Sequence, residues 1–402
     1  MKTKLVIFGI TGDLSTRKLL PALEHILNSG EFDDLSIVGV SRSDLDVAEL
    51  LQHALGDNQV SDRFSGFTLD LARAGDYQGL KDYLALTPQD QALIYLSVPP
   101  SAAAQIVNFL GQAGLNTPNV KLLFEKPFGF NLDTAQDFIE RTAQHFNDAQ
   151  IYRIDHYMAK EVAAEIIRLR SNAENHHHSW GKQSITSIDI VASESIGIEG
   201  RSVFYEQTGA LRDFIQGHLM QLLSLVLMDV PTDFDNRQLS TYRLRALEQL
   251  NLADPDGSIR AQYEGYQDDA HNPGSLTETF VNMRLSSSDP KWQDVGLRLV
   301  TGKNLQDKRT SITVTYTDGT QDVFEEATVA PDDARLPDAY ERVLKEAILG
   351  NKAIFTSSAE IIRSWEIVFP VQQAWEFDED PLSLYPAGAA WQNVTDSTVS
   401  VE

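Results

Sequence analysis

Basic side chains that could bind an anion gather in the segment Tyr152-Arg153-Ile154-Asp155-His156-Tyr157-Met158-Ala159-Lys160-Glu161. His156 and Lys160 are four residues apart, so on a helix they would share one face. Two nitrogen donors placed in this way suit a phosphate dianion. The alternative is a solvated helix start, with Asp155 as the N-terminal cap and no ligand.

A histidine stands in the middle of the apolar segment Gly209 to Met228. The spacing of Leu211, Ile215, Leu222 and Val226 predicts a helix, and His218 falls on its apolar stripe. A lone histidine there is more often a satisfied core residue than a catalyst, and the pattern leaves both open. Asp213 lies about 140° around an ideal α-helix from His218. A partner from elsewhere in the chain is therefore the better candidate to orient His218.

Lys126 follows the apolar run Val120 to Phe124, in the sequence Glu125-Lys126-Pro127-Phe128-Gly129. In doubly wound folds, ligands bind at the carboxyl ends of the parallel strands, which is where this lysine would lie. The alternative is a solvated lysine after a strand, and the neighbouring proline, which fixes the local turn, weakens it.

A glycine-containing turn follows the first apolar run, in Gly9-Ile10-Thr11-Gly12-Asp13-Leu14-Ser15. Glycines let the backbone approach a pyrophosphate, and the N-terminus of the next helix supplies free N–H groups. A plain strand-to-helix turn is the alternative. The second strand ends at Arg42, where enzymes that prefer NAD often have an acid. A guanidinium suits a 2′-phosphate, so we expect NADP, with NAD as the other candidate; pairing of Arg42 with Asp44 or Asp46 is the competing interpretation.

The elements that must position these residues follow two patterns. Up to about residue 125, short apolar runs alternate with helical segments, which predicts a doubly wound parallel sheet of the Rossmann type. Beyond residue 150, partly alternating runs predict a mostly antiparallel sheet with helices on one side. We therefore expect an α/β domain that binds a dinucleotide over residues 1–150, and an α+β domain over residues 151–402 for substrate binding, catalysis and oligomerisation.

Composition excludes several classes of function. The chain has 402 residues, a formal net charge of −25 and no cysteine. The negative charge argues against binding nucleic acid or anionic lipid, and the lack of cysteine excludes disulfides, thiolate nucleophiles and cysteine-ligated metals. No apolar segment reaches the ~20 residues of a membrane span. We expect a soluble, cytoplasmic protein.

The motifs together resemble the glucose-6-phosphate dehydrogenase family, in the family's order along nearly the whole chain. They are GITGDLSTRKLLPAL, EKPFG, RIDHYMAKE, EGRSVFYEQTGALRD, QGHLMQ, the pair Gly302-Lys303, and LPDAYERVL. The resemblance implies an enzyme that oxidises D-glucose 6-phosphate at C1 to 6-phospho-D-glucono-1,5-lactone. Hydride would pass to NADP, in the entry step of the pentose phosphate pathway.

The resemblance also implies roles for individual residues. His218 would be the general base, and Asp155 would orient it and stabilise its charge. His156, Tyr157, Lys160 and Lys308 would hold the sugar phosphate, while Glu194, Asp213 and Lys303 would bind sugar hydroxyls. Lys126 would lie between substrate and cofactor. The cofactor site would comprise Gly9, Thr11, Gly12, Asp13, Leu14, Lys18, Arg42 and Lys126.

The chain departs from the family in length. It is shorter by roughly a fifth, with the deficit between about Thr317 and Arg335 and at the C-terminus. The missing strands belong to the sheet that forms the family's dimer interface, so we expect a homodimer with a reduced interface. His176, His177 and His178 are also unlike the family, and we expect a polar loop rather than a metal site, because consecutive residues cannot all face one ion.

Two other functions fit parts of this pattern. One is a related oxidoreductase that acts on an unphosphorylated sugar, but His156, Lys160 and Lys308 would then have little purpose. The other is a non-catalytic NADP-binding sensor, which would not need a general base.

Overall fold

The computed structural model of the protein describes residues 2–171, 179–231, 233–326 and 338–399. The chain divides into two compact units. Unit 1 comprises residues 1–129, 133–159 and 335–358, and unit 2 comprises residues 130–132, 160–334 and 359–402. The polar loop predicted at His176, His177 and His178 lies outside the described residues.

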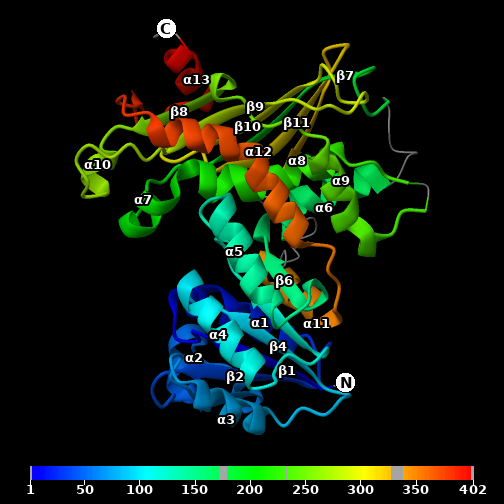
Figure 1. Ribbon diagram of the computed structural model, residues 1–402, viewed down its shortest axis with the longest axis vertical. Helices are drawn as coiled ribbons and strands as arrows, with labels where there is room; N and C mark the ends of the chain where they lie inside the picture. Colours follow the sequence, from blue (N-terminus) through cyan, green and yellow to red (C-terminus); the bar gives the residue numbers. More distant parts are fainter. Residues whose placement is uncertain (1, 172–178, 232, 327–337, 400–402) are drawn as a thin grey trace. The chain divides into compact units, whose positions relative to one another are not determined.

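Unit 1 contains a seven-stranded sheet in the order β13-β6-β5-β4-β1-β2-β3. All neighbours are parallel except β13, which runs antiparallel to β6 (Figure 1). The strands are β1 (Thr3–Phe8), β2 (Leu35–Ser41), β3 (Phe64–Thr68), β4 (Gln91–Leu96), β5 (Val120–Phe124), β6 (Ile151–Ile154) and β13 (Phe355–Thr356).

Helices cover both faces of this sheet, as the predicted doubly wound arrangement requires. The continuous apolar run from Leu5 to Phe8 is fully buried, which is typical of a parallel strand covered on both sides. One face packs against α1 (Leu20–Asn28), α2 (Val47–Leu55) and α11 (Ala339–Leu349). The other helices of the unit are α3 (Ala74–Leu84), α4 (Pro100–Gln112) and α5 (Leu132–Ala143).

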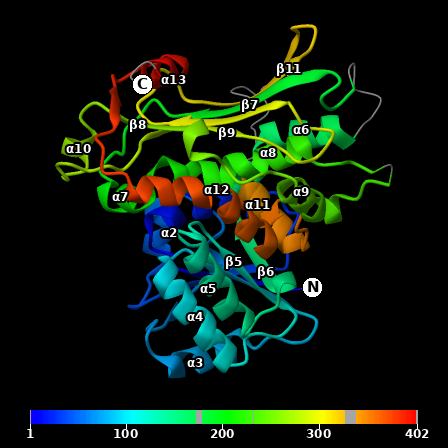
Figure 2. The same cartoon turned by 45° about the horizontal axis from the view of Figure 1, so that its top comes forward.

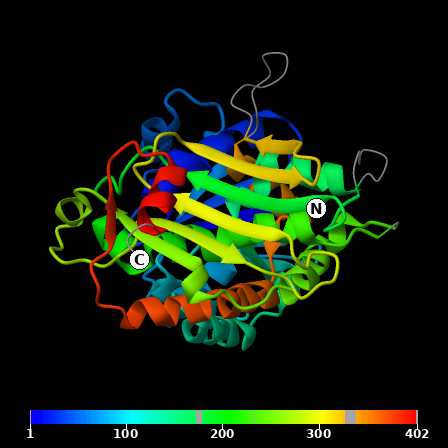
Figure 3. The ribbon, with the colours of Figure 1, turned by 90° about the horizontal axis from the view of Figure 1, so that it is seen from above.

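Unit 2 contains a second seven-stranded sheet, in the order β12-β11-β7-β10-β9-β8-β14. Its neighbours are antiparallel except for the pairs β7 with β10 and β8 with β14 (Figure 3). The prediction of a mostly antiparallel sheet is confirmed. The strands are β7 (Ile185–Ser193), β8 (Ser258–Tyr263), β9 (Phe280–Leu285), β10 (Gly296–Gly302), β11 (Arg309–Tyr316), β12 (Gln321–Glu325) and β14 (Ser383–Tyr385).

Most helices of unit 2 lie on one face of this sheet, as predicted, while the last one, α13, lies on the other face (Figures 1 and 2). On that other face, Val394 of α13 is buried and Thr395 accepts a hydrogen bond from Asn282 of β9. The helices are α6 (Glu161–Ser171), α7 (Ser202–Ala210), α8 (Met220–Leu227), α9 (Leu239–Glu248), α10 (Tyr266–Asp269), α12 (Ser358–Phe377) and α13 (Trp391–Val399).

The long helix predicted from Gly209 to Met228 differs from the expectation at its beginning. Gly209, the residue before the last of α7, has φ +60° and ψ −179°, which are not helical values and which kink the chain there. The next helix then opens as a π-helix, η6 (Leu211–Leu219), and continues as α8. Rare π-helical turns inside α-helices frequently mark functional sites.

A buried ion pair fixes the long helix α12 within unit 2. The Nε atom of Arg243 on α9 donates to Glu360 Oε1 on α12 at 2.7 Å, and both side chains are fully buried. Ser240 donates to the second carboxylate oxygen at 2.5 Å. Four residues further on, Ser364 accepts a hydrogen bond of 2.8 Å from Gln216 of η6. The pair therefore supports the helix that carries His218.

Substitution of Glu360 by glutamine should destabilise unit 2, because it removes the negative charge that is paired with the buried guanidinium of Arg243. Breaking a buried pair by removing one partner costs about 3–5 kcal/mol. The partly exposed pair Arg363–Glu366 on the same helix provides the control, and E366Q should cost less than about 1 kcal/mol. Chemical unfolding of the two variants measures both effects, and equal losses would contradict this interpretation.

Candidate active site

The glycine turn after β1 is shaped for close approach of a ligand. Gly9 has φ +80°, and a Cβ atom on it would lie 2.2 Å from the carbonyl oxygen of Ser97. The turn is closed by the Gly12 N–H, which donates to Gly9 O at 2.9 Å, and by the Ser15 hydroxyl, which donates to the same oxygen. A side chain at position 9 would clash with the Ser97 carbonyl, so the turn requires glycine, and it leads into a helix whose N-terminus can bind a phosphate.

The other predicted cofactor residues surround this turn on the surface of unit 1. Thr11, Asp13, Lys18 and Arg42 are exposed, and Leu14 is partly buried. Arg42 directly follows β2, and within the described residues it forms no ion pair with Asp44 or Asp46. Asp46 instead caps α2 by accepting the Glu49 N–H. The guanidinium therefore remains available for a phosphate, and the turn with Arg42 fits a dinucleotide with a 2′-phosphate.

Glu125 and Lys126 lie at the carboxyl end of β5, as predicted. The Lys126–Pro127 peptide bond is cis. The carboxylate of Glu125 accepts a hydrogen bond from the hydroxyl of Tyr95. Burial raises the pKa of Glu125 to about 7, and the negative charge of Asp155 adds to this rise, while the Tyr95 hydrogen bond and Lys126 lower it. Glu125 is therefore poised to change charge near neutral pH.

Asp155 follows β6 in the same unit and is buried, with 3% of its surface exposed. Its Oδ1 atom accepts the Tyr157 N–H at 3.0 Å, so it caps the 3₁₀ turn η4 (His156–Ala159). The ring of His156 stacks on Tyr340 of α11 at 6.2 Å. Capping and a role towards a ligand are thus compatible for Asp155, because a carboxylate has more than one acceptor position.

The expectation that His156 and Lys160 share one helical face is wrong. The turn η4 ends at Ala159 and α6 begins at Glu161, so no continuous helix joins the two residues. His156 belongs to unit 1 and Lys160 to unit 2. In unit 2, Lys160 Nζ forms an ion pair of 2.9 Å with Glu326. Lys308 is exposed in the loop before β11.

Glu194 and Lys303 are brought together by the sheet of unit 2. They directly follow the carboxyl ends of the parallel neighbours β7 and β10, where Ser193 is paired with Gly302. The Lys303 ammonium forms an ion pair with the Glu194 carboxylate. Lys303 is 3% exposed, so this charge needs a close partner. The two strands therefore create a charged pair from residues that are far apart in sequence.

Aromatic rings connect this pair to His218. The Lys303 ammonium lies 5.0 Å from the ring centroid of Tyr205 and 5.9 Å from that of Phe214. The Phe214 ring meets the His218 ring edge-on at 5.6 Å. His218 itself is buried, with 2% exposed. Unit 2 thus places an imidazole, an ammonium and a carboxylate around two rings.

The π-helix changes the predicted relation between Asp213 and His218. Residues five apart are hydrogen-bonded neighbours along a π-helix, whereas they diverge on an α-helix. The argument that Asp213 lies on a different face from His218 is therefore wrong for η6. Burial is the main cause that raises the pKa of Tyr205. The negative charges of Asp213, Glu278 and Glu194 raise it further. Asp213 thus belongs to the same cluster as Glu194 and Lys303.

Three aromatic residues of these clusters were missed by sequence analysis. Phe214 precedes His218 by four residues, a spacing that could have indicated contact. Tyr205 and Tyr340 lie in motifs that resemble the family, but only the folded chain brings them to Lys303 and His156. Large apolar side chains give no sequence signal that separates them from core residues.

These features define a class: an oxidoreductase that uses a nicotinamide dinucleotide, with a doubly wound cofactor unit and a second unit that holds a buried histidine and polar side chains. Residues 6–164 match the profile "Glucose-6-phosphate dehydrogenase, NAD binding domain". Residues 167–336 and 329–400 match "Glucose-6-phosphate dehydrogenase, C-terminal domain". The chain belongs to the glucose-6-phosphate dehydrogenase family.

Individual relatives agree with this assignment. The chain is 32% identical to Glucose-6-phosphate 1-dehydrogenase of Gluconobacter oxydans, over 96% of this chain and 93% of that protein. The crystal structure of Glucose-6-phosphate 1-dehydrogenase from Mycobacterium avium matches with a TM-score of 0.84 and 28% identity, covering 96% and 94% of the two chains. A structure described as "Glucose-6-phosphate dehydrogenase in complex with its substrate glucose-6-phosphate" matches in fold, with a TM-score of 0.89 and 24% identity over 99% and 97%.

Substitution of Glu125 by glutamine should remove a pH dependence of stability in unit 1. The folded-state pKa of Glu125 is raised from 4.5 to about 7, so the folded protein binds the extra proton and loses stability as pH rises through this interval. E125Q should therefore gain in melting temperature relative to the wild type more at pH 8 than at pH 5. Thermal unfolding at the two pH values checks this, with substitution of the exposed Glu140 by glutamine as the control. An equal difference in melting temperature between E125Q and the wild type at pH 5 and at pH 8 would refute the raised pKa of Glu125.

Proposed function

We propose that this protein oxidises D-glucose 6-phosphate at C1 to 6-phospho-D-glucono-1,5-lactone with NADP, as the entry step of the pentose phosphate pathway. The observation that carries the proposal is buried His218 beside Phe214, whose ring also faces the ammonium of Lys303, in a chain of this family. A buried imidazole among polar side chains suits a general base, because its ordinary pKa lies near neutral pH.

His218 takes the proton of the C1 hydroxyl, and Asp155 orients the imidazole and stabilises the positive charge that forms on it. The family resemblance supports the Asp155 assignment. The π-helical position of Asp213 makes that residue a second candidate for the same role, beside its assignment to a sugar hydroxyl. A carboxylate next to the imidazole favours the protonated form and therefore increases its basicity.

The substrate's polar groups have separate partners. His156, Tyr157, Lys160 and Lys308 bind the phosphate, in accordance with their positive or hydrogen-bonding character. Glu194, Asp213 and Lys303 bind sugar hydroxyls, which is supported by the buried ion pair of Glu194 with Lys303. Because a sugar hydroxyl both donates and accepts, an adjacent carboxylate and ammonium can bind it from both sides.

The residues of the glycine turn fit NADP, which supplies the hydride acceptor when it is bound. Gly9, Gly12, Asp13 and Leu14 form the backbone that receives the pyrophosphate, supported by their position between β1 and the following helix. Thr11 and Arg42 hold the phosphates on the adenine side, and Lys18 and Lys126 line the junction with the substrate.

We infer further that the protein works in the cytoplasm as a homodimer with a reduced interface. The absence of cysteine fits a reducing compartment. Among the described helices, none is long and apolar enough to cross a membrane. Family resemblance supports the homodimer, and a measurement of molar mass in solution tests it.

Substitution of His218 by asparagine should reduce kcat by about 10²–10⁴-fold, because it removes the general base. The dissociation constant for NADP should stay unchanged. Absorbance of the reduced cofactor, recorded with glucose 6-phosphate, measures the loss, and unphosphorylated glucose provides a comparison substrate. No turnover of any hexose phosphate by the wild type would disprove the function, and equal rates on glucose would favour an oxidoreductase for unphosphorylated sugars.

Substitution of Arg42 by alanine should weaken the binding of NADP more than the binding of NAD, because only NADP carries the 2′-phosphate. Loss of a charge-assisted hydrogen bond corresponds to about 10-fold or more in KM for NADP. Steady-state kinetics with both cofactors give the ratio. Asp44→Ala is the matched control on the same loop, and a parallel loss of both cofactors in R42A would count against a specific contact.

A further inference from the structure

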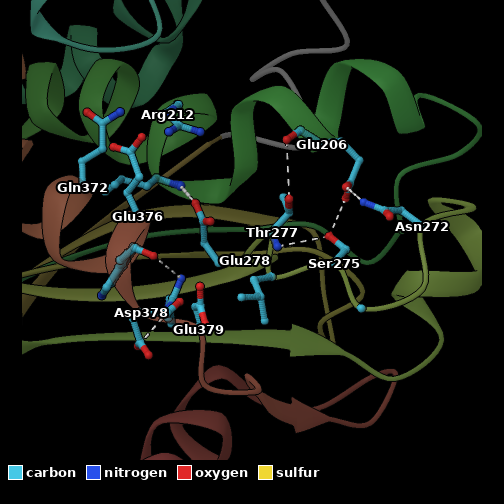
Figure 4. Close-up of a pocket in the computed structure, with 15 residues that line it drawn as sticks. Glu206, Arg212, Asn272, Ser275, Thr277, Glu278, Gln372, Glu376, Asp378 and Glu379 are labelled. Carbon is cyan, nitrogen blue, oxygen red and sulfur yellow. Dashed lines mark hydrogen bonds and ion pairs between the residues drawn. The ribbon is translucent and has the colours of Figure 1, made fainter.

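The beginning of the helix that carries His218 is hydrogen-bonded to Glu278, a residue that lies outside this helix. In Figure 4, Glu278 lies next to the beginning of this helix, near Arg212. Glu278 belongs to the segment before β9 and is 8% exposed. Neither sequence motifs nor the proposed mechanism assign it a role.

Three consecutive residues contact Glu278. The Ala210 N–H donates to the Glu278 backbone oxygen at 3.0 Å, and the Leu211 N–H donates to Glu278 Oε1 at 2.8 Å. A Cβ atom on Gly209 would lie only 2.4 Å from the same Oε1 atom. The first N–H groups of a helix have no partner within it, and a carboxylate there is favoured by the helix dipole. Glu278 thus supplies a cap that the local sequence does not.

The neighbouring residue fixes the other part of the cluster. The Thr279 carbonyl accepts the Lys303 N–H at 2.9 Å. The Tyr385 hydroxyl lies 2.9 Å from Thr279 Oγ1 and donates to the Lys303 carbonyl at 2.7 Å. Adjacent residues, Glu278 and Thr279, therefore hold the start of the π-helix and the backbone of Lys303.

We propose that Glu278 is a positioning residue, which sets the π-helix with Asp213, Phe214 and His218 in register with Lys303. This proposal rests on the proposed function, in which His218 must meet the C1 hydroxyl while Lys303 binds the same sugar. Burial raises the pKa of Glu278, and the N–H of Leu211 and the charge of Arg212 oppose this rise. The acceptor at the position of Oε1, 2.8 Å from the Leu211 nitrogen, carries most of the effect, and the negative charge adds to it.

A cavity of about 430 Å³ adjoins this contact and is lined by Leu211, Arg212 and Glu278, with Glu376 also on its wall (Figure 4). Water can reach the helix start from this cavity when the Glu278 side chain is shortened. The free N–H would then be hydrated, so removal of the side chain should loosen the helix without collapse of the core.

The experiment compares E278Q, E278D and E278A in the full-length protein, with E376A as control on the same cavity. Glutamine keeps an acceptor at the same distance without the charge, whereas aspartate keeps the charge but is shorter. E278Q should retain most of kcat, while E278D and E278A should lose on the order of 10²-fold, the effect of a misplacement of about 1 Å. The NADP dissociation constant should not change, nor should E376A affect kcat.

A second readout does not need the substrate. The titration midpoint of the His218 imidazole, followed by NMR, should change in E278D but not in E278Q. If E278A does not fold, the comparison of E278Q with E278D still decides. Wild-type-like kcat in E278D would overturn the proposal. A loss of kcat in E278Q as large as that in E278D would overturn it as well. Absence of turnover by the wild type would instead disprove the proposed function, and the His218 titration would then test the positioning role alone.

Discussion

The burial of one ammonium group is the constraint on which the site in unit 2 depends. Lys303 is 3% exposed, and a charge in that environment must have a close partner. Glu194 provides it, and the faces of Tyr205 and Phe214 provide further stabilisation. Because both charged residues follow adjacent parallel strands, the rigid sheet fixes their separation. The helix with His218 must then pack against a pair that is already in place.

The rest of unit 2 supports that packing. Gly209 turns the chain, Glu278 caps the π-helix, and Gln216 on the helix donates to Ser364 of α12. The buried pair of Arg243 and Glu360 fixes α12 in turn. Unit 1 uses a different principle. Its glycine turn and Arg42 lie at strand ends, where a parallel sheet leaves room for a nucleotide. Rigid elements thus hold the proposed site residues of each unit.

Much of the fold could be predicted because its signals are local. The buried runs at Leu5–Phe8 and Val120–Phe124 are strands, and the glycine turn follows the first, as expected. The π-helix could not be predicted, because its apolar spacing resembles that of an α-helix. Glu278, which contacts its beginning, lies far away in the sequence. The pairing of β7 with β10 joins residues about a hundred positions apart, and strand order leaves no trace in either strand's own sequence.

The proposed function requires that the imidazole of His218 and the ammonium of Lys303 act on one glucose 6-phosphate molecule. A crystal structure of the protein with glucose 6-phosphate and NADP answers this. The C1 hydroxyl should lie within about 2.6–3.2 Å of a ring nitrogen of His218, as a general base requires. Another hydroxyl of the same sugar should lie at Lys303. A sugar bound with C1 away from His218, or with no hydroxyl at Lys303, would contradict the proposed function.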